Sequence, residues 1–330
     1  MHLKLLVTGG TGYIGSYLVH RLSQDERVER IYVLSRSYKD FLNQYGDRME
    51  HVRQDVKDLE GLKAQVERLE PDVVLHLAAL IKGNYLEFIG TNVVGTMHML
   101  EAVKDMSIRL FVFASTAANL YGNAIYRPID EKHPLNPISL YGLSTQLAED
   151  AVKFYALRYE VPAVIFRQTN VYGWAPVMKY ALVNALIRSA LEEGVLKVFG
   201  SGRQQRNLIH ISDLARYYEA AIFHQKPEVL RGEVLNVAGP QTTTVMEVAE
   251  LLRDLLRDKY GLKVEIRHEP RPDRKFEVYD FPISYEKAKK LLGVEARICL
   301  RTGLEMELER ALKGHGSRKT INYKWLSSET

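Results

Sequence analysis

Short runs of apolar residues alternate with longer amphipathic stretches through the first half of the chain. Such runs are typical of strands buried in a parallel sheet, and apolar positions three and four apart are typical of the helices that cover it. The pattern predicts strands at residues 3–8, 30–34, 49–52, 73–77, 110–114 and 163–167. It predicts helices at residues 13–24, 59–69, about 87–104 and 140–158. This alternation indicates an α/β protein with a doubly wound parallel Rossmann sheet.

After Tyr172 the alternation becomes irregular, and loops that contain Gly and Pro separate the predicted elements. Thr244-Val-Met-Glu247 has the spacing of a capping box and predicts a helix that continues to about residue 259. We expect this half to form a smaller α+β lobe that binds the substrate. The predicted division is a dinucleotide-binding domain at 1–172 with a returning segment near 207–238, a substrate lobe at 173–206 and 239–313, and a tail at 314–330.

The overall composition excludes several classes of protein. The 330 residues are 46% hydrophobic, which is enough for a large buried core. No run of about 18 apolar residues occurs, so we expect no membrane-spanning helix. Lys and Arg number 45 against 41 Asp and Glu, and no basic cluster is interleaved with aromatic residues. We therefore expect no nucleic-acid partner, and the small positive excess is compatible with an anionic small-molecule substrate.

Cysteine usage and the first residues bear on location and on metal binding. The lone Cys299 cannot form an internal disulfide, which suits a reducing compartment. The first predicted strand begins at Leu3 and leaves no room for a signal peptide, so we expect a cytoplasmic protein. No Cys and His cluster has the spacing of metal ligands, and we expect no metal.

A glycine-rich segment, Thr8-Gly-Gly-Thr-Gly-Tyr-Ile-Gly15, lies between the first predicted strand and the first predicted helix. Gly9 permits a tight turn, Gly12 permits close approach of a pyrophosphate, and Gly15 permits close packing of helix and strand. The start of the helix then offers free N–H groups to the phosphates. In this strand–turn–helix context the segment predicts a dinucleotide-binding loop. Its candidate contacts are Gly9, Thr11, Gly12, Tyr13, Ile14 and Gly15.

The end of the second predicted strand bears on the choice of cofactor. An acidic residue there would bind the adenosine ribose of NAD and repel a 2′-phosphate, but this chain has Ser35-Arg36. A hydroxyl and a guanidinium suit a phosphate, so the pair favours NADP, with NAD as the alternative. The alternative is that Arg36 is an ordinary surface arginine in contact with solvent and has no part in cofactor choice. Asp55, followed by Val56, is a candidate contact for the adenine.

These residues and several later motifs resemble the extended short-chain dehydrogenase/reductases, specifically the nucleotide-sugar epimerase/dehydratase family. The resemblance covers residues 3 to about 312. Its motifs beyond the glycine loop are His76-Leu77-Ala78-Ala79, Asn92-Val-Val-Gly-Thr96, Ser115-Thr116 with Tyr121-Gly122, Tyr141-Gly142, Arg167 with Asn170-Val-Tyr-Gly173, Phe199-Gly-Ser-Gly202 with Arg206, Asp213, Asn236, Arg271-Pro272 and Leu292-Gly293.

The resemblance implies a nucleotide-diphosphate sugar held between two lobes, with hydride exchanged between the sugar and a nicotinamide. Tyr141 is then the acid/base and Thr116 its hydroxyl partner, with Ser115 as the alternative. Relatives that dehydrate the sugar carry Asp and Glu after this threonine, and Ala117 and Ala118 stand there instead, which disfavours a dehydratase.

The resemblance also implies binding residues and a homodimer. The dimer would form through the predicted helices near 87–104 and 140–158. The implied cofactor contacts are Leu77, Ala78, Ala79 and Asn92, and the implied substrate contacts are Asn170, Arg206 and Arg271.

One family position is not matched. Four residues after Tyr141 the family carries a lysine that lowers the tyrosine pKa, and this chain has Thr145. A tyrosine with its ordinary pKa near 10 is about a thousandfold too protonated at neutral pH to act readily as a base. Lys82, just beyond the fourth predicted strand, is a hypothetical substitute.

Three functions are compatible with this departure. A 4-ketosugar reductase needs its tyrosine only as a proton donor, so a neutral tyrosine suffices, and this is the function we favour from the sequence. The alternative is a nucleotide-sugar 4-epimerase with tightly held NAD and a compensating cation. A third hypothesis is a catalytically inactive relative that binds nucleotides as a regulatory or scaffold subunit.

Overall fold

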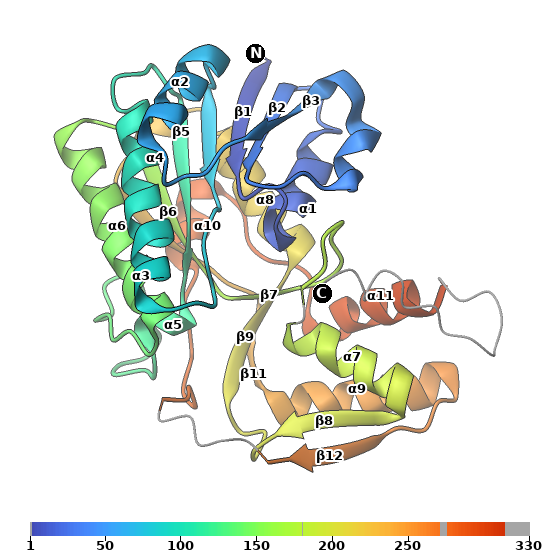
Figure 1. Ribbon diagram of the computed structural model, residues 1–330. Coiled ribbons are helices and arrows are strands. Elements are labelled where there is room, and N and C mark those ends of the chain that lie inside the picture. Colours follow the sequence, from blue (N-terminus) through green and yellow to red (C-terminus); the bar gives the residue numbers. More distant parts are fainter. Residues whose placement is uncertain (1, 180, 271–275, 314–330) are drawn as a thin grey trace.

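The computed structural model describes residues 2–179, 181–270 and 276–313 (Figure 1). Its main feature is a seven-stranded sheet in the order β10-β6-β5-β4-β1-β2-β3, in which all neighbours pair in parallel. The predicted fold class is therefore confirmed, with one strand more than the apolar runs indicated. The strands are β1 (Leu3–Thr8), β2 (Val28–Ser35), β3 (Met49–Arg53), β4 (Val73–His76), β5 (Leu110–Thr116), β6 (Ala163–Gln168) and β10 (Glu233–Val237).

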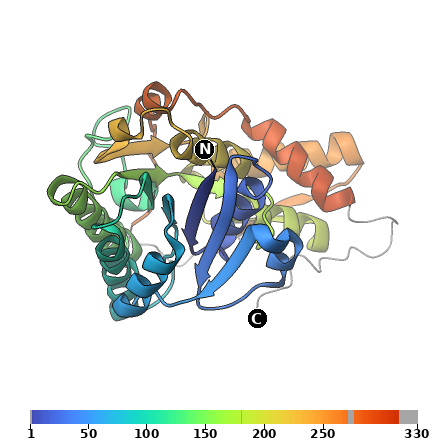
Figure 2. The same ribbon diagram turned by 90° about the horizontal axis from the view of Figure 1, so that it is seen from above.

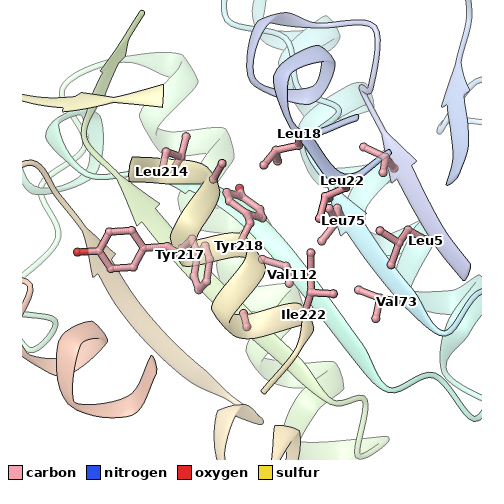
Figure 3. Packing of buried hydrophobic residues seen from close by; sticks show 14 of the residues in the cluster. Leu5, Leu18, Leu22, Val73, Leu75, Val112, Leu214, Tyr217, Tyr218 and Ile222 are labelled. Carbon is pink, nitrogen blue, oxygen red and sulfur yellow. The ribbon is translucent and has the colours of Figure 1, made fainter. Parts of the chain in front are cut away.

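Helices cover both faces of this sheet (Figure 2). Successive residues of β1 enter different clusters: Leu5 and Val7 pack with α1 and α8, and Leu6 packs with α2, α4 and α6. Figure 3 shows Leu18 of α1 and Ile222 of α8 in the first cluster. This alternation is the period of two expected of a strand that is buried on both sides. The helices are α1 (Tyr13–Leu22), α2 (Leu59–Leu69), α4 (Gly95–Val103), α6 (Leu140–Arg158) and α8 (Ile211–Ile222).

The single helix predicted near 87–104 is divided in the structure. It begins as the short α3 (Tyr85–Phe88), continues as the π-helical turn η2 (Ile89–Val94) and then becomes α4. The π turn places Asn92 where its side chain accepts from the Leu80 N–H at 2.8 Å and donates to the Ser144 hydroxyl at 2.9 Å. Turns of this kind are frequent at functional sites. Here the turn ties the loop after β4 to the helix that carries Tyr141.

The second half of the chain adds a smaller lobe (Figure 1). Two small sheets lie in this half, β11-β9-β7 and β12-β8. The capping box is present, because Thr244 accepts from the Glu247 N–H and Glu247 accepts from the Thr244 N–H. Its strands are β7 (Asn170–Tyr172), β8 (Val195–Phe199), β9 (Gln205–His210), β11 (Thr242–Thr244) and β12 (Glu265–Glu269), and its helices are α7 (Leu182–Glu193), α9 (Val245–Tyr260) and α11 (Leu300–Lys313).

Short elements complete the fold. They are η1 (Asp40–Arg48), α5 (Ala118–Tyr121), η3 (Pro227–Leu230) and α10 (Glu286–Leu292). In the described ranges no helix is long and apolar enough to cross a membrane. The predicted tail at 314–330 lies outside the described residues.

Candidate active site

The glycine loop has the close contacts that its sequence indicated. Gly9 has a positive φ of 68°, and a Cβ there would lie 2.8 Å from the Ala78 nitrogen. A Cβ on Gly15 would collide with the Gly9 carbonyl. Helix α1 begins at Tyr13, and no side chain caps its first N–H groups. The loop therefore presents a free helix start that can accept a phosphate.

A cavity of about 310 Å³ lies beside this loop, and we call it the loop cavity. It is lined by most of the residues predicted to hold the cofactor, together with six that the sequence analysis missed: Leu34, Ser37, Lys39, Gln54, Leu80 and Thr91. Asp55 is the only acidic residue in the described lining. The predicted residues that line the cavity are Gly9, Thr11, Gly12, Ser35, Arg36, Asp55, Val56, Leu77, Ala78 and Ala79.

Two of the predicted cofactor residues lie outside the linings of both cavities: Gly15 and Asn92 line neither this cavity nor the one around Tyr141.

His76, at the end of β4, lies between the Thr8 hydroxyl at 2.8 Å and the Thr96 hydroxyl at 3.1 Å. Complete burial lowers the pKa of His76 to about 4, so this imidazole is neutral and part of the core.

A second cavity, of about 500 Å³, surrounds Tyr141, and we call it the Tyr141 cavity. The predicted residues Tyr13, Ile14, Ser115, Thr116 and Asn170 also line it. The structure thus brings together residues from four distant parts of the chain. Further lining residues are Ile81, Phe88, Asn119, Ser139, Leu140, Gln168, Thr169, Val171, Lys179 and Ala181.

The two candidate hydroxyls beside Tyr141 differ in their partners. Ser115 donates to the buried Glu149 carboxylate at 2.5 Å, so its hydroxyl is already engaged. Thr116 Oγ1 has only a long contact, 3.5 Å from the Asn119 amide nitrogen. Thr116 therefore has the hydroxyl that is free to bind a ligand, as its position in the family motif implied.

Glu149 belongs to a buried network that the sequence analysis did not anticipate. Arg167 donates to Glu149 at 2.6 Å and to the Tyr121 hydroxyl at 2.8 Å. Tyr121 in turn donates to the Asn236 side chain at 2.8 Å. A charge pair inside the core is tolerated only when its hydrogen bonds are made, as they are here. The network fixes Ser115 and the end of β5 beside the Tyr141 cavity.

Tyr141 lies in the first turn of α6, where Ser139 caps the helix by accepting from the Gly142 N–H at 3.0 Å. Burial raises the pKa of Tyr141 above its usual value, and the Thr145 side chain offsets part of the rise. The Thr145 hydroxyl also donates to the Tyr141 carbonyl at 2.8 Å. Thr145 brings no positive charge, so the phenol is neutral around pH 7.

The Tyr141 cavity does contain a cation. Lys179 is the only charged side chain in the described part of its lining, and Lys82 does not line it. Partial removal from water and the positive charge of Lys82 lower the pKa of Lys179, although the residue remains exposed at the edge of the cavity. The two lysines are therefore near each other, and neither makes an ion pair with a carboxylate of the described residues.

The two arginines predicted to hold the substrate are not in this cavity. Arg206 pairs with Glu277 at 2.7 Å and lies outside the lining. Arg271 falls outside the described residues. Within the described ranges no group of three or more His, Cys, Asp or Glu is placed to hold a metal ion.

The parallel sheet, the glycine loop and the adjoining cavities define a dinucleotide-binding protein of the Rossmann class. The sequence model of the NAD dependent epimerase/dehydratase family matches residues 5–238, and the chain belongs to this family.

Three relatives from this family are similar over more than nine tenths of the chain. A putative UDP-glucose 4-epimerase from Methanocaldococcus jannaschii is 31% identical over 91% of this chain and 96% of its own length. UDP-glucuronic acid decarboxylase 6 from Arabidopsis thaliana is 30% identical over 92% of this chain and 88% of its own. The UDP-glucuronic acid 4-epimerase of Bacillus cereus, solved with UDP-glucuronic acid and NAD, superposes with a TM-score of 0.80 at 26% identity, covering 93% of this chain and 98% of its own.

These findings confirm the predicted family and shift the balance between the predicted functions. The names of the relatives support the 4-epimerase alternative better than the 4-ketosugar reductase that we favoured from the sequence. The structural neighbours solved with a dinucleotide contain NAD, and they give no support to a preference for NADP.

Proposed function

We propose that this protein is a nucleotide-sugar 4-epimerase that retains its dinucleotide through the catalytic cycle. The observation that carries the proposal is the Tyr141 cavity, where a phenol and the free Thr116 hydroxyl lie close to the glycine loop. The similarity to proteins named UDP-glucose and UDP-glucuronic acid 4-epimerases supports the same reaction and a UDP-sugar substrate.

The residues would share the work as follows. A bound dinucleotide supplies a hydride acceptor that later returns the hydride to the opposite face of the sugar. Tyr141 would take the proton of the sugar C4 hydroxyl. It would return a proton to the same oxygen after the keto sugar has rotated to present its opposite face. Thr116 hydrogen-bonds the same oxygen in both half-reactions. Ala117 and Ala118 provide neither the acid nor the base that elimination of the C6 hydroxyl requires.

The reaction can be tested directly. The purified protein, with no cofactor added, should convert UDP-glucose to UDP-galactose. Its absorbance spectrum should show the absorbance of dinucleotide that stayed bound during purification. Oxidation of added NADPH by a 4-keto-6-deoxy sugar nucleotide, without epimerisation, would instead establish a reductase. Binding of UDP-sugars without turnover in either assay would indicate the inactive relative.

One observation keeps the reductase as a second candidate. The phenol of Tyr141 has a raised pKa and lacks the family lysine, and a neutral phenol is already the correct form for a proton donor. The epimerase needs the same group as a base as well, so it needs a positive charge nearby. We assign that charge to Lys179, since it lies in the cavity and Lys82 does not.

Replacing Lys179 with methionine is therefore expected to lower kcat by about tenfold or more and to shift the rising limb of the pH–rate profile to higher pH, because the phenol loses a neighbouring positive charge. Lys179 is not among the groups that shift the pKa of Tyr141 in the structure, so the effect requires its ammonium group to approach the phenolate when substrate is bound. At a few ångströms a unit charge contributes a few kcal/mol at an effective dielectric constant of about 20. Lys82→Met is the matched control and should have the smaller effect. A rise in KM with an unchanged pH profile would show that Lys179 holds the substrate instead.

The loop cavity allows a proposal about cofactor choice. Arg36 and Lys39 both line it, and neither forms an ion pair with a described carboxylate. We propose that this pair accepts the 2′-phosphate of NADP and that NAD binds as well. The proposal keeps the cofactor predicted from Ser35-Arg36, with Lys39 added.

Arg36→Gln is expected to weaken NADPH binding by about tenfold to a hundredfold and to leave NADH binding unchanged. The reason is that a hydrogen bond to a charged group contributes about 1.5–3 kcal/mol. Fluorescence titration with both cofactors measures the ratio, and Lys39→Gln should reproduce the effect in part. An equal loss for NADPH and NADH would refute the assignment.

The proposal includes a homodimer and the predicted division into lobes. Exposed apolar side chains lie along α6, with Leu143 45%, Leu147 40%, Phe154 51% and Leu157 75% exposed, and Met97 of α4 is 41% exposed. A face of this kind suits a contact between two copies. Light scattering of the purified protein tests it. The domain boundary near 172 stays a prediction.

A further inference from the structure

Two adjacent side chains at the end of β6 are buried without complete hydrogen bonding. Gln168 is 7% exposed and Thr169 is 6% exposed. Gln168 Oε1 and Thr169 Oγ1 have no hydrogen-bond partner among the described residues. Both residues line the Tyr141 cavity, next to Asn170.

The surrounding backbone holds this pair in place. The Gln168 carbonyl accepts from the Ala117 N–H at 2.8 Å, and the Thr169 N–H donates to the Val237 carbonyl at 3.0 Å. The Gln168 amide nitrogen donates to the Ser115 carbonyl at 3.4 Å, which leaves Oε1 as the free end of the amide. If the amide were turned over, an oxygen would face that carbonyl, so the Ser115 carbonyl sets the orientation.

Leaving a buried oxygen unpaired destabilises the folded state, and native proteins contain few such groups. Two of them side by side on the wall of one cavity need an explanation. The orphaned hydroxyls of Tyr172 and Tyr218 lie outside this lining and give no comparable cluster. A polar ligand in the cavity can supply the missing bonds once the two side chains turn toward it.

We propose that Gln168 and Thr169 recognise hydroxyl groups of the substrate's sugar and so determine which sugar is accepted. This inference rests on the proposed function, because it assigns the sugar subsite of the same cavity. A carboxamide oxygen accepts from a hydroxyl, and a threonine hydroxyl can donate or accept. A carboxylate offers no donor to Gln168 and would be repelled by its oxygen. The pair therefore fits a neutral hexose better than a hexuronate.

Both oxygens are shielded from solvent in the structure. Binding of the sugar therefore requires both side chains to rotate toward the cavity, and for Gln168 this breaks the long 3.4 Å bond from its amide nitrogen to the Ser115 carbonyl. Recognition through groups that are unpaired before binding has a known consequence. A site that hydrogen-bonds a substrate hydroxyl discriminates strongly against an analogue without that hydroxyl, because the protein groups then stay unpaired.

The test uses Thr169→Val and Gln168→Met, which keep the approximate shape and remove the free oxygen. We expect the unfolding midpoint of each variant to stay equal or to rise, because an unpaired buried oxygen has been removed. Calorimetric affinity for UDP-glucose should fall by about tenfold to a hundredfold, and affinity for UDP alone should not change. Thr169→Ser, which restores the hydroxyl, should recover most of the UDP-glucose affinity.

The wild-type protein should also bind UDP-glucose more tightly than UDP-glucuronic acid. The inference alone is overturned if UDP-glucose binds and neither variant changes its affinity relative to UDP. It is equally overturned if the variants unfold more easily, since the two oxygens would then have structural partners, or if UDP-glucuronic acid binds better. Failure of the wild type to bind UDP or any UDP- or dTDP-sugar would overturn the proposed function together with the inference.

Discussion

Replacing Tyr141 with phenylalanine should reduce turnover by about a hundredfold to ten-thousandfold while the affinities for dinucleotide and nucleotide sugar change little. The loss corresponds to the contribution of a positioned proton donor or acceptor. Phenylalanine keeps the ring, which in the wild type packs 6.4 Å from the ring of Phe88, centroid to centroid. The cavity wall should therefore survive the substitution. Steady-state kinetics and dinucleotide titration measure the two effects separately.

The pH dependence provides the control for Tyr141→Phe. Burial raises the pKa of Tyr141, so the phenolate fraction increases with pH through the neutral and alkaline range. The oxidative half-reaction, which needs the phenolate, should accelerate with pH in the wild type, and the residual rate of the variant should lack this rise. A variant that keeps the wild-type rate and profile would show that Tyr141 is not the proton carrier.

Much of the fold could be predicted because buried parallel strands are continuous apolar runs. The run at residues 3–8 coincides with β1, and the helix at 140–158 coincides with α6. β10 was missed as a strand because Glu233–Val237 is short and contains polar Glu233 and Asn236, and its position in the sheet depends on pairing with β6 across about 70 residues. Pairing over such a separation leaves no local pattern.

The candidate site could be predicted only where one segment carries its own chemistry. The glycine loop and Tyr141 are local motifs, and the structure places them on the walls of the two cavities. The sequence favoured Thr116 over Ser115 only through its place in the family motif, because the physical difference between them depends on Glu149, a residue 34 positions away from Ser115. Lys179 was missed for the same reason: only the folded chain brings it to the cavity.

The Glu149–Arg167 pair should carry a large share of the stability of the site. Glu149→Ala is expected to lower the free energy of unfolding by about 3–5 kcal/mol, because it leaves the Arg167 charge buried without its partner. It also removes the acceptor of the Ser115 hydroxyl. Urea denaturation monitored by circular dichroism measures the loss.

Two controls show whether burial is the cause. Glu160 and Arg231 are also paired, at 3.1 Å, but Glu160 is 77% exposed, so Glu160→Ala should cost at most about 1 kcal/mol. The double variant Glu149→Met with Arg167→Met removes both buried charges and should be more stable than Glu149→Ala, since apolar pairs of similar volume often replace buried ion pairs without loss. If the double variant were as unstable as the single one, the cost would arise from lost packing and hydrogen bonds at the end of β5. The uncompensated guanidinium would then be a minor factor.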